Sequence, residues 1–236
     1  MTEGTNIFFC SMEIVSLATS TGRWSVVAKG MRPSISSDGK RLAYVGLGGG
    51  TDCTQSLGPV VVREVDTGRE RRWTGRQGMD GFEGDIMRLA WSPDSVHLAI
   101  QRNIGDPYYE IRILDTRKGE DVLDARLISP GTESWAQPTY LDDHSLLVAS
   151  SGSKGDGVDG EHIVYSINLV SSRWRTIVDL PAGVTSLDFD ESREHLLAVS
   201  LDFTKGDFGR AVWVWHDGDL KTIVNDGPVI QGVWWR

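Results

Sequence analysis

The sequence predicts an all-β fold, a β-propeller of about five four-stranded blades formed by a single domain. Three observations predict it. A turn motif between two apolar stretches recurs along the chain, and each copy is followed by two more strand-like stretches joined by a tight turn. The 236 residues also include 27 glycines and nine tryptophans, which suit tight turns and aromatic packing between sheets. Four-stranded units that recur at such intervals are typical of propellers.

The first half of each repeat predicts two antiparallel strands, A and B, around the turn motif. Ile35, Trp91, Tyr140 and Phe189 take equivalent positions, which gives spacings of 56, 49 and 49 residues. The four copies are residues 33–44, 89–100, 138–149 and 186–197, and residues 231–236 match the beginning of a fifth copy.

The second half of each repeat predicts strands C and D. The four copies are residues 60–70, 111–120, 162–174 and 211–220. Thr-Gly and Asp-Gly pairs in these stretches suit the positive φ of hairpin turns, and β-branched and aromatic residues fill the strands. No stretch shows convincing helical periodicity.

The two ends of the sequence complement each other. Residues 6–18 and 21–27 predict strands B, C and D without an A, whereas residues 230–235 predict an A alone. Together they would complete one blade and close the ring, which removes an open sheet edge. We expect a closing blade from 1–28 with 229–236, and further blades at roughly 29–75, 86–128, 136–180 and 183–226. A truncated six- or seven-bladed ring is the alternative.

The composition narrows the class of partner. A formal net charge of −9 argues against nucleic acid or an anionic membrane as the main partner. No apolar run approaches the roughly 20 residues of a membrane span, so no membrane insertion is expected. The first residues carry no signal-peptide pattern. We expect a monomer, extracytoplasmic if a leader or anchor precedes this sequence in the native protein and cytoplasmic otherwise.

The turn motifs resemble those of TolB-like and WD40-like propeller repeats. The resemblance rests on Ser92-Pro93-Asp94 and Ser37-Asp38-Gly39, each followed by Leu-Ala, and it covers nearly the whole chain. The third and fourth copies, at 141–143 and 190–192, lack the Pro-Asp pair, and no Gly-His…Trp-Asp signature is present. The resemblance implies a scaffold that binds proteins or ligands, often outside the cytoplasm in bacteria.

The predicted connections differ between the two faces of the propeller. The A–B and C–D turns are short throughout, whereas the B–C and D–A loops on the other face are long, at 46–58, 75–85, 102–109, 129–137, 150–161 and 201–210. Long loops on a rigid scaffold are where function usually lies. Acidic and aromatic residues in these loops suit a cationic partner, a sugar or a basic protein patch. The candidate ligand-binding residues are Asp85, Trp135, Phe203, Glu133, Tyr108, Phe82 and Asp207.

The leading functional prediction is therefore a non-enzymatic binding propeller that engages a protein or small ligand through this acidic and aromatic face. The alternative is a glycosidase-like hydrolase with Asp85 and Glu133 as carboxylates at the channel mouth. No G-x-S-x-G motif is present to support serine catalysis. No cofactor is expected.

A metal site has weak support in the sequence. Asp156, Asp159 and Glu161 could offer carboxylates to Ca²⁺, but Val158 occupies the middle ligand position of the usual calcium loop. A solvated glycine-rich loop explains these residues better. The five histidines form no zinc-binding pattern.

The two cysteines, Cys10 and Cys53, are expected on the same face of neighbouring blades. A disulfide between them would stabilise the fold by a few kcal/mol and would require an oxidising compartment. Two unpaired thiols in a cytosolic protein are the alternative.

Overall fold

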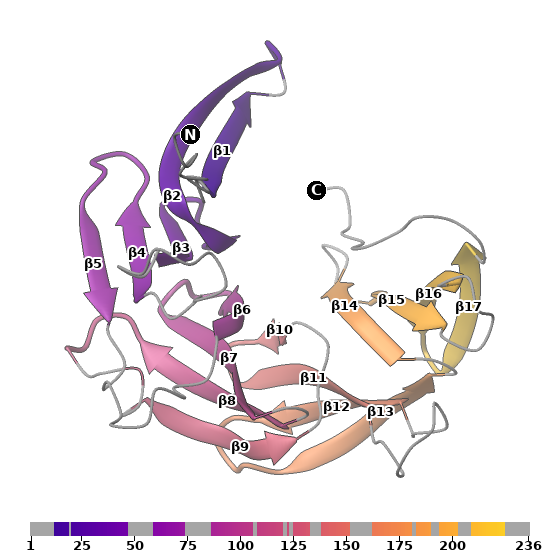
Figure 1. The fold of residues 1–236 in the computed structure, drawn as a ribbon. Helices are drawn as coiled ribbons and strands as arrows, with labels where there is room; N and C mark the ends of the chain where they lie inside the picture. The colour runs from indigo at the N-terminus through magenta and orange to yellow at the C-terminus, as the bar shows by residue number, and fades with distance from the viewer. Residues whose placement is uncertain are drawn as a thin grey trace, which may run out of the picture.

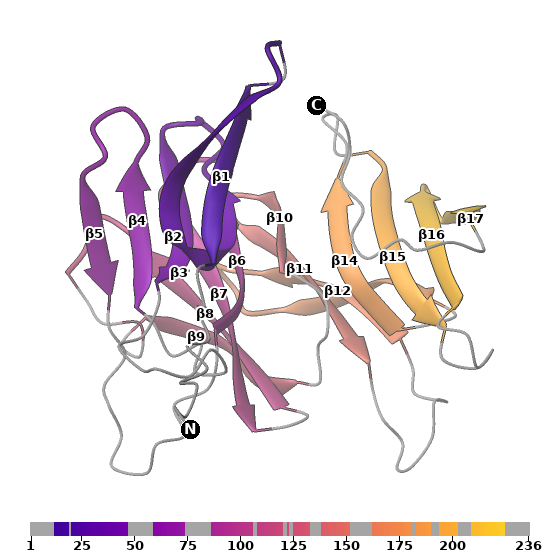
Figure 2. The ribbon, with the colours of Figure 1, turned by 45° about the horizontal axis from the view of Figure 1, so that its top comes forward.

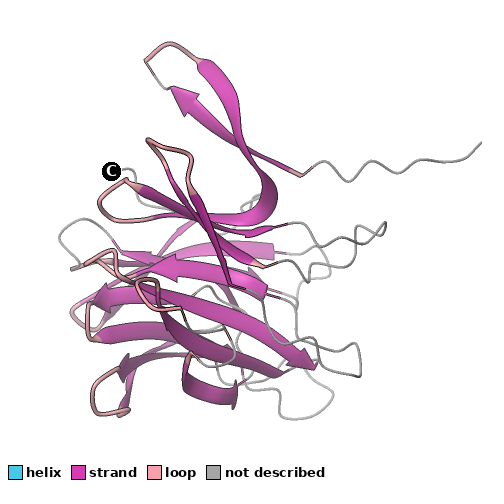
Figure 3. Cartoon of the chain, turned by 90° about the vertical axis from the view of Figure 1, so that its left-hand side faces the viewer, coloured by secondary structure: helices cyan, strands magenta, loops and turns pink. Residues whose placement is uncertain are grey.

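The computed structural model consists of β-strands joined by turns and loops (Figure 3). It describes residues 12–18, 20–46, 59–73, 86–105, 108–119, 122, 125–132, 138–151, 162–180, 183–189, 194–202 and 209–224. In these residues there is no helix with the length and apolar character needed to cross a membrane. The prediction of an all-β fold is confirmed.

Four sheets follow one another along the chain, with antiparallel strands in sequence order: the first has five strands, of which the last four form blade 1, and the other three have four strands each. Blade 1 contains β2 (Arg23–Ile35), β3 (Arg41–Gly46), β4 (Val60–Glu64) and β5 (Glu70–Trp73). Blade 2 contains β6 (Ile86–Trp91), β7 (His97–Gly105), β8 (Tyr108–Asp115) and β9 (Arg126–Thr132). Blade 3 contains β10 (Thr139–Asp142), β11 (Ser145–Ser151), β12 (His162–Asn168) and β13 (Trp174–Leu180). Blade 4 contains β14 (Gly183–Phe189), β15 (Leu196–Asp202), β16 (Gly209–His216) and β17 (Asp219–Val224).

The blades are arranged in an arc as in a propeller, with the first strand of each blade towards the centre and the fourth at the periphery (Figure 1). Apolar side chains fill the spaces between blades. Leu98, Ile100 and Leu114 of blade 2 pack with Val45 and Val60 of blade 1. The opposite side of blade 2 packs on blade 3, and blade 3 packs on blade 4 in the same way. Successive side chains of a strand point to opposite faces of its sheet, so alternate residues pack against the preceding blade and the following blade.

The expectation of about five blades is corrected to four complete blades in the described residues. The remaining part is a hairpin of β1 (Glu13–Ala18) with the beginning of β2, which continues without a break into blade 1. These strands match the predicted C and D strands of the closing blade. Residues 6–11 and 230–235, which would supply its B and A strands, lie outside the described residues, so closure of the ring is not shown.

Two predicted connections differ from the expectation. The C–D connection of blade 2 spans 116–125, so the C–D turns are not short throughout. Arg71 explains the difference, because its guanidinium donates to the main-chain oxygens of Thr116, Arg117 and Lys118 and fixes this segment against blade 1. The B–C loop predicted at 102–109 is also wrong, since β7 extends to Gly105 and β8 begins at Tyr108. Asn103 pairs with Tyr109 within this hairpin.

Candidate functional site

The face that carries the A–B and C–D connections is here called the turn face, and hydrogen bonds within the A–B turns of blades 1 and 2 fix these turns. In blade 1 the Ser36 hydroxyl donates to Asp38 and accepts from the Arg41 amide. In blade 2 the Ser92 hydroxyl makes the same two contacts, to Asp94 and from the His97 amide. The Ser-x-Asp pattern that these two turns share therefore closes each of them, since a short polar side chain replaces water on the main-chain groups.

Neighbouring A–B turns are also bonded to one another. The Asp38 amide donates to Ser95 Oγ at 3.0 Å, and the Asp94 amide donates to Asp143 Oδ1 at 2.7 Å. Ser37 Oγ donates to the main-chain oxygen of Ser92 at 3.3 Å. The turns of blades 1, 2 and 3 thus form a continuous hydrogen-bonded row across the turn face.

The innermost strands are held together as well. Trp91 Nε1 on β6 donates to the Ser34 oxygen on β2 at 3.0 Å. Thr139 Oγ1 on β10 donates to the Leu187 oxygen on β14 at 2.9 Å. These bonds fix the first strand of one blade against that of the next, which gives the loops at the other strand ends a rigid base.

The opposite face, here called the loop face, is where ligand-binding residues were predicted. Tyr108, predicted within the loop at 102–109, is instead the first residue of β8 at this end of the strand, and its role in ligand binding stays a prediction. The other candidate ligand-binding residues, the candidate calcium ligands and both cysteines lie outside the described residues, so these assignments stay predictions: Asp85, Trp135, Phe203, Glu133, Phe82, Asp207, Asp156, Asp159, Glu161, Cys10 and Cys53. Among the described residues there is no group of three or more His, Cys, Asp or Glu that could hold a metal.

A buried charge cluster lies at the loop-face end of blade 2. The side chains of Arg102 on β7 and Glu110 on β8 are 8% and 9% exposed and form an ion pair. Arg112 joins them, with its Nε 2.8 Å from Glu110 Oε1, and also donates to the Ala125 oxygen at 3.1 Å. The carboxylate is therefore shared by two guanidinium groups, which compensates the cost of burying these charges.

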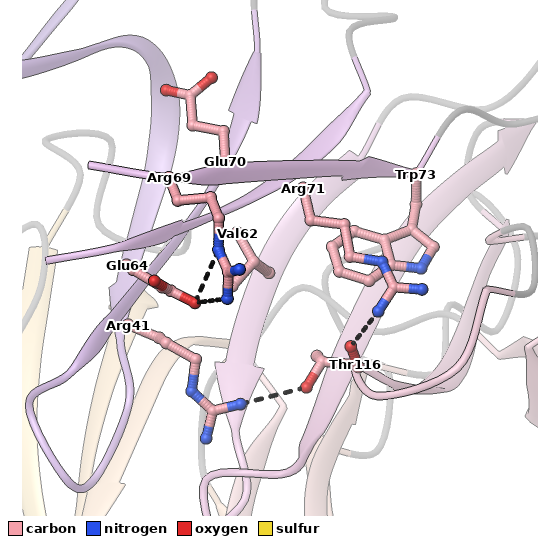
Figure 4. Close-up of a pocket in the computed structure, with 8 residues that line it drawn as sticks. All are labelled: Arg41, Val62, Glu64, Arg69, Glu70, Arg71, Trp73 and Thr116. Carbon is pink, nitrogen blue, oxygen red and sulfur yellow. Dashed lines mark hydrogen bonds and ion pairs between the residues drawn. The ribbon is translucent and has the colours of Figure 1, made fainter. Parts of the chain in front are cut away.

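A pocket of about 440 Å³ lies between the outer parts of blades 1 and 2 (Figure 4). Its lining residues are Arg41, Val62, Glu64, Arg69, Glu70, Arg71, Trp73 and Thr116. None of its arginines was expected as a site residue, because their grouping depends on contacts between blades that no local pattern reveals.

The arginines of this pocket already have partners. Arg69 pairs with Glu64, and Arg41 donates to Thr116 Oγ1 at 3.3 Å. Arg71 is bound to the main chain of blade 2, and its guanidinium lies 4.8 Å from the Trp73 ring centroid. Glu70 points away from Arg69 (Figure 4). It accepts a hydrogen bond from the Tyr44 hydroxyl at 2.7 Å. Burial, together with this carboxylate, raises the pKa of Tyr44 to about 12. The pocket is therefore a structural contact between two blades.

Four-stranded antiparallel blades around a common centre, held together at their inner strands and turns, define a β-propeller. No family model matches the sequence, and no curated protein matches it. Solved structures do match. The tricorn protease superposes with a TM-score of 0.64 at 12% sequence identity, over 92% of this chain and 25% of that chain.

Two TolB structures match to a similar extent. TolB from Acinetobacter baumannii gives a TM-score of 0.63 at 16% identity, over 91% of this chain and 49% of that chain. The putative TolB from Agrobacterium tumefaciens gives 0.61 at 16% identity, over 90% and 69%. This chain thus spans about a quarter of the tricorn protease and half of the Acinetobacter TolB. At these identities the likeness concerns the fold, which is a TolB-like β-propeller.

Proposed function

We propose that this chain is a non-enzymatic binding propeller that engages a cationic ligand or a basic protein surface through its loop face. The asymmetry of the two faces carries the proposal. Hydrogen bonds between turns hold the turn face, and the two longest connections between strands, 47–59 and 74–85, both leave the opposite strand ends. Long loops on a rigid scaffold are a common place for binding sites.

The charge of these connections supports a cationic partner. The segments 47–58, 74–85, 106–107, 133–137, 152–161 and 203–208 together contain ten acidic and three basic residues. The same segments carry the aromatic residues Phe82, Trp135, Phe203 and Phe208. Carboxylates attract a cation at a distance, and aromatic faces bind it at contact.

The test compares two triple variants of the intact chain. The first carries Asp85→Asn, Trp135→Ala and Phe203→Ala on the loop face. The control carries Asp66→Asn, Asp217→Asn and Trp174→Ala, which are exposed in or beside the C–D turns of the turn face. Binding to a lysine- and arginine-rich peptide is measured by biolayer interferometry, and a glycan array is probed in parallel.

We expect the loop-face variant to lose at least about tenfold in affinity for the basic peptide, since charge-assisted and cation–π contacts are each worth about 1 kcal/mol or more. The control should bind as the unchanged protein does, and all three should show the same far-ultraviolet circular dichroism. Equal binding by the two variants would place the site elsewhere. Binding confined to the glycan array would replace the cationic partner with a carbohydrate.

We further propose that the ring is closed by a fifth blade built from both ends of the chain. Residues 6–11 and 230–235 would add its B and A strands to the β1–β2 hairpin. The hairpin supports this proposal, because Val15, Leu17 and Trp24 on one of its faces are 53%, 59% and 68% exposed. A closed ring predicts a monomer by light scattering, whereas concentration-dependent oligomers would contradict closure.

A further inference from the structure

Two arginines occupy the same position in neighbouring repeats. Arg32 lies three residues before Ile35, and Arg88 lies three residues before its equivalent, Trp91. They belong to β2 and β6, the innermost strands of blades 1 and 2, which the Trp91–Ser34 hydrogen bond holds side by side (Figures 1 and 2). Burial and, next, the positive charge of Arg32 lower the pKa of Arg88, in line with the neighbouring positions of the two residues.

The backbone at Arg32 is strained. Its φ of 57° lies in the left-handed region, which residues other than glycine seldom adopt. Pro33 follows it, and the ring of a proline sterically disfavours helical backbone conformations at the preceding residue. Arg32 and Pro33 form an irregularity between Met31, which pairs with Val45, and Ser34, which pairs with Ala43. Strain of this kind is concentrated at functional sites, where the surrounding structure fixes it.

Arg32 and Arg88 also differ from other arginines of this region in the partners of their guanidinium groups. Arg32 Nε is buried and has no hydrogen-bond acceptor among the described residues. No carboxylate in the described part of the chain forms an ion pair with Arg32 or Arg88. Arg102, by contrast, is buried in blade 2 and pairs with Glu110. Two neighbouring positive charges in a partly buried place are unfavourable unless an anion compensates them.

We propose that Arg32 and Arg88 form a binding site for a small oxyanion, a carboxylate or phosphate group, at the inner edge between blades 1 and 2. The planar guanidinium presents parallel N–H donors that match the oxygens of both groups. The anion would accept from the buried Arg32 Nε and neutralise the repulsion between the two arginines. The site lies on the inner strands and is independent of the acidic loop face, which would repel a free anion.

The site is tested by isothermal titration calorimetry of the intact chain with inorganic phosphate and, separately, with acetate, at constant ionic strength in chloride. Arg32→Gln and Arg88→Gln are compared with Arg175→Gln, which removes the same charge from an exposed position on β13. We expect saturable binding of at least one of the two anions to the unchanged protein and to the control. Either inner-strand substitution should weaken it about tenfold or more, as expected for loss of a charge-assisted hydrogen bond.

Thermal unfolding without added oxyanion supplies a second measurement that does not depend on detecting the ligand. If the arginines repel each other in the empty site, Arg88→Gln raises the melting temperature, and it abolishes the further rise that the bound anion produces in the unchanged protein. A lower melting temperature for Arg88→Gln would show that a carboxylate of the chain already pairs with this arginine. That result, absence of saturable binding, or equal affinity in all variants would overturn the proposal.

Discussion

Glu110 is the residue on which the buried charge of blade 2 depends. It is the carboxylate shared by Arg102 and Arg112, and both arginine side chains are buried or nearly so. Glu110→Gln keeps the shape of the side chain but leaves the guanidinium groups without a counter-charge. We expect a loss of about 3–5 kcal/mol in the free energy of unfolding, measured by urea denaturation.

The same change at a surface pair provides the control. Glu64 pairs with Arg69, whose side chain is 79% exposed, so Glu64→Gln should lower the free energy of unfolding far less than Glu110→Gln does. Similar losses for the two variants would show that the blade 2 cluster is solvated and contributes no more than a surface pair.

Asp115 gives the fold a dependence on pH in the acidic range. Hydrogen bonds from the Arg117 side chain lower the pKa of this buried carboxyl to about 2. Because the folded pKa lies below the unfolded value of about 3.9, the ionised carboxylate stabilises the fold above pH 4 and this contribution is lost as the pH falls towards 2. As the pH falls from 4 to 2, the free energy of unfolding should decrease less in Asp115→Asn than in the unchanged protein. The difference should be on the order of 1–2 kcal/mol, because solvent around the exposed Arg117 weakens its interaction with Asp115. Identical slopes in acid titrations followed by circular dichroism would contradict this.

At the scale of strands, the A–B hairpins could be predicted from sequence because their determinants are local. Ser36 and Asp38 close the first turn with their own side chains, and the flanking residues alternate between two blade interfaces. The C–D connection of blade 2 could not be predicted in this way. Residues 111–120 have the pattern of a strand and tight turn, but Arg71 of another blade binds the main chain at 116–118.

The positions of the candidate site residues could be predicted from local pattern only in part. Tyr108 was placed on the loop face, but within a long loop at 102–109, whereas in the structure it is the first residue of β8. The pairing of Arg102 with Glu110 depends on strand register, and the neighbouring positions of Arg32 and Arg88 depend on the contact between β2 and β6. A repeated arginine three residues before Ile35 and Trp91 was present in the sequence, but alone it does not distinguish a binding site from a surface position.

Gly30 is the point at which β2 passes from the hairpin into blade 1. A Cβ atom here would lie 2.5 Å from the Val45 oxygen and 2.6 Å from a ring carbon of Tyr44. Gly30→Ala should therefore force the hairpin away from blade 1 and cost about 1–3 kcal/mol in unfolding free energy. Gly119→Ala, where the nearest atom is 3.6 Å away, should change it by less than about 0.5 kcal/mol. Equal stability of the two variants would show that this passage is loosely packed.

For the whole molecule, the β1–β2 hairpin and blade 4 stand at the two ends of the arc of blades (Figures 1 and 2). One face of the hairpin packs on blade 1, where Ile14 and Ala28 contact Tyr44 and Val61. The other face carries two apolar cross-strand pairs, Val15 with Val26 and Leu17 with Trp24. Exposed apolar surface of this kind is costly in water, so a partner surface is expected on it. In a five-bladed ring the partner surface would be the side of blade 4 that faces the hairpin.

Leu17 distinguishes a closed ring from an open arc. In a closed ring its side chain lies between two blades, and Leu17→Ser should cost about 2–3 kcal/mol through lost apolar burial. In an open arc it stays more than half exposed, and the change should be nearly neutral. Val170→Ser serves as the control, because Val170 is 73% exposed in the C–D turn of blade 3. Urea denaturation of both variants decides between the two arrangements. A loss at Leu17 no larger than that at Val170 would mean that the hairpin face is free and the ring does not close through it.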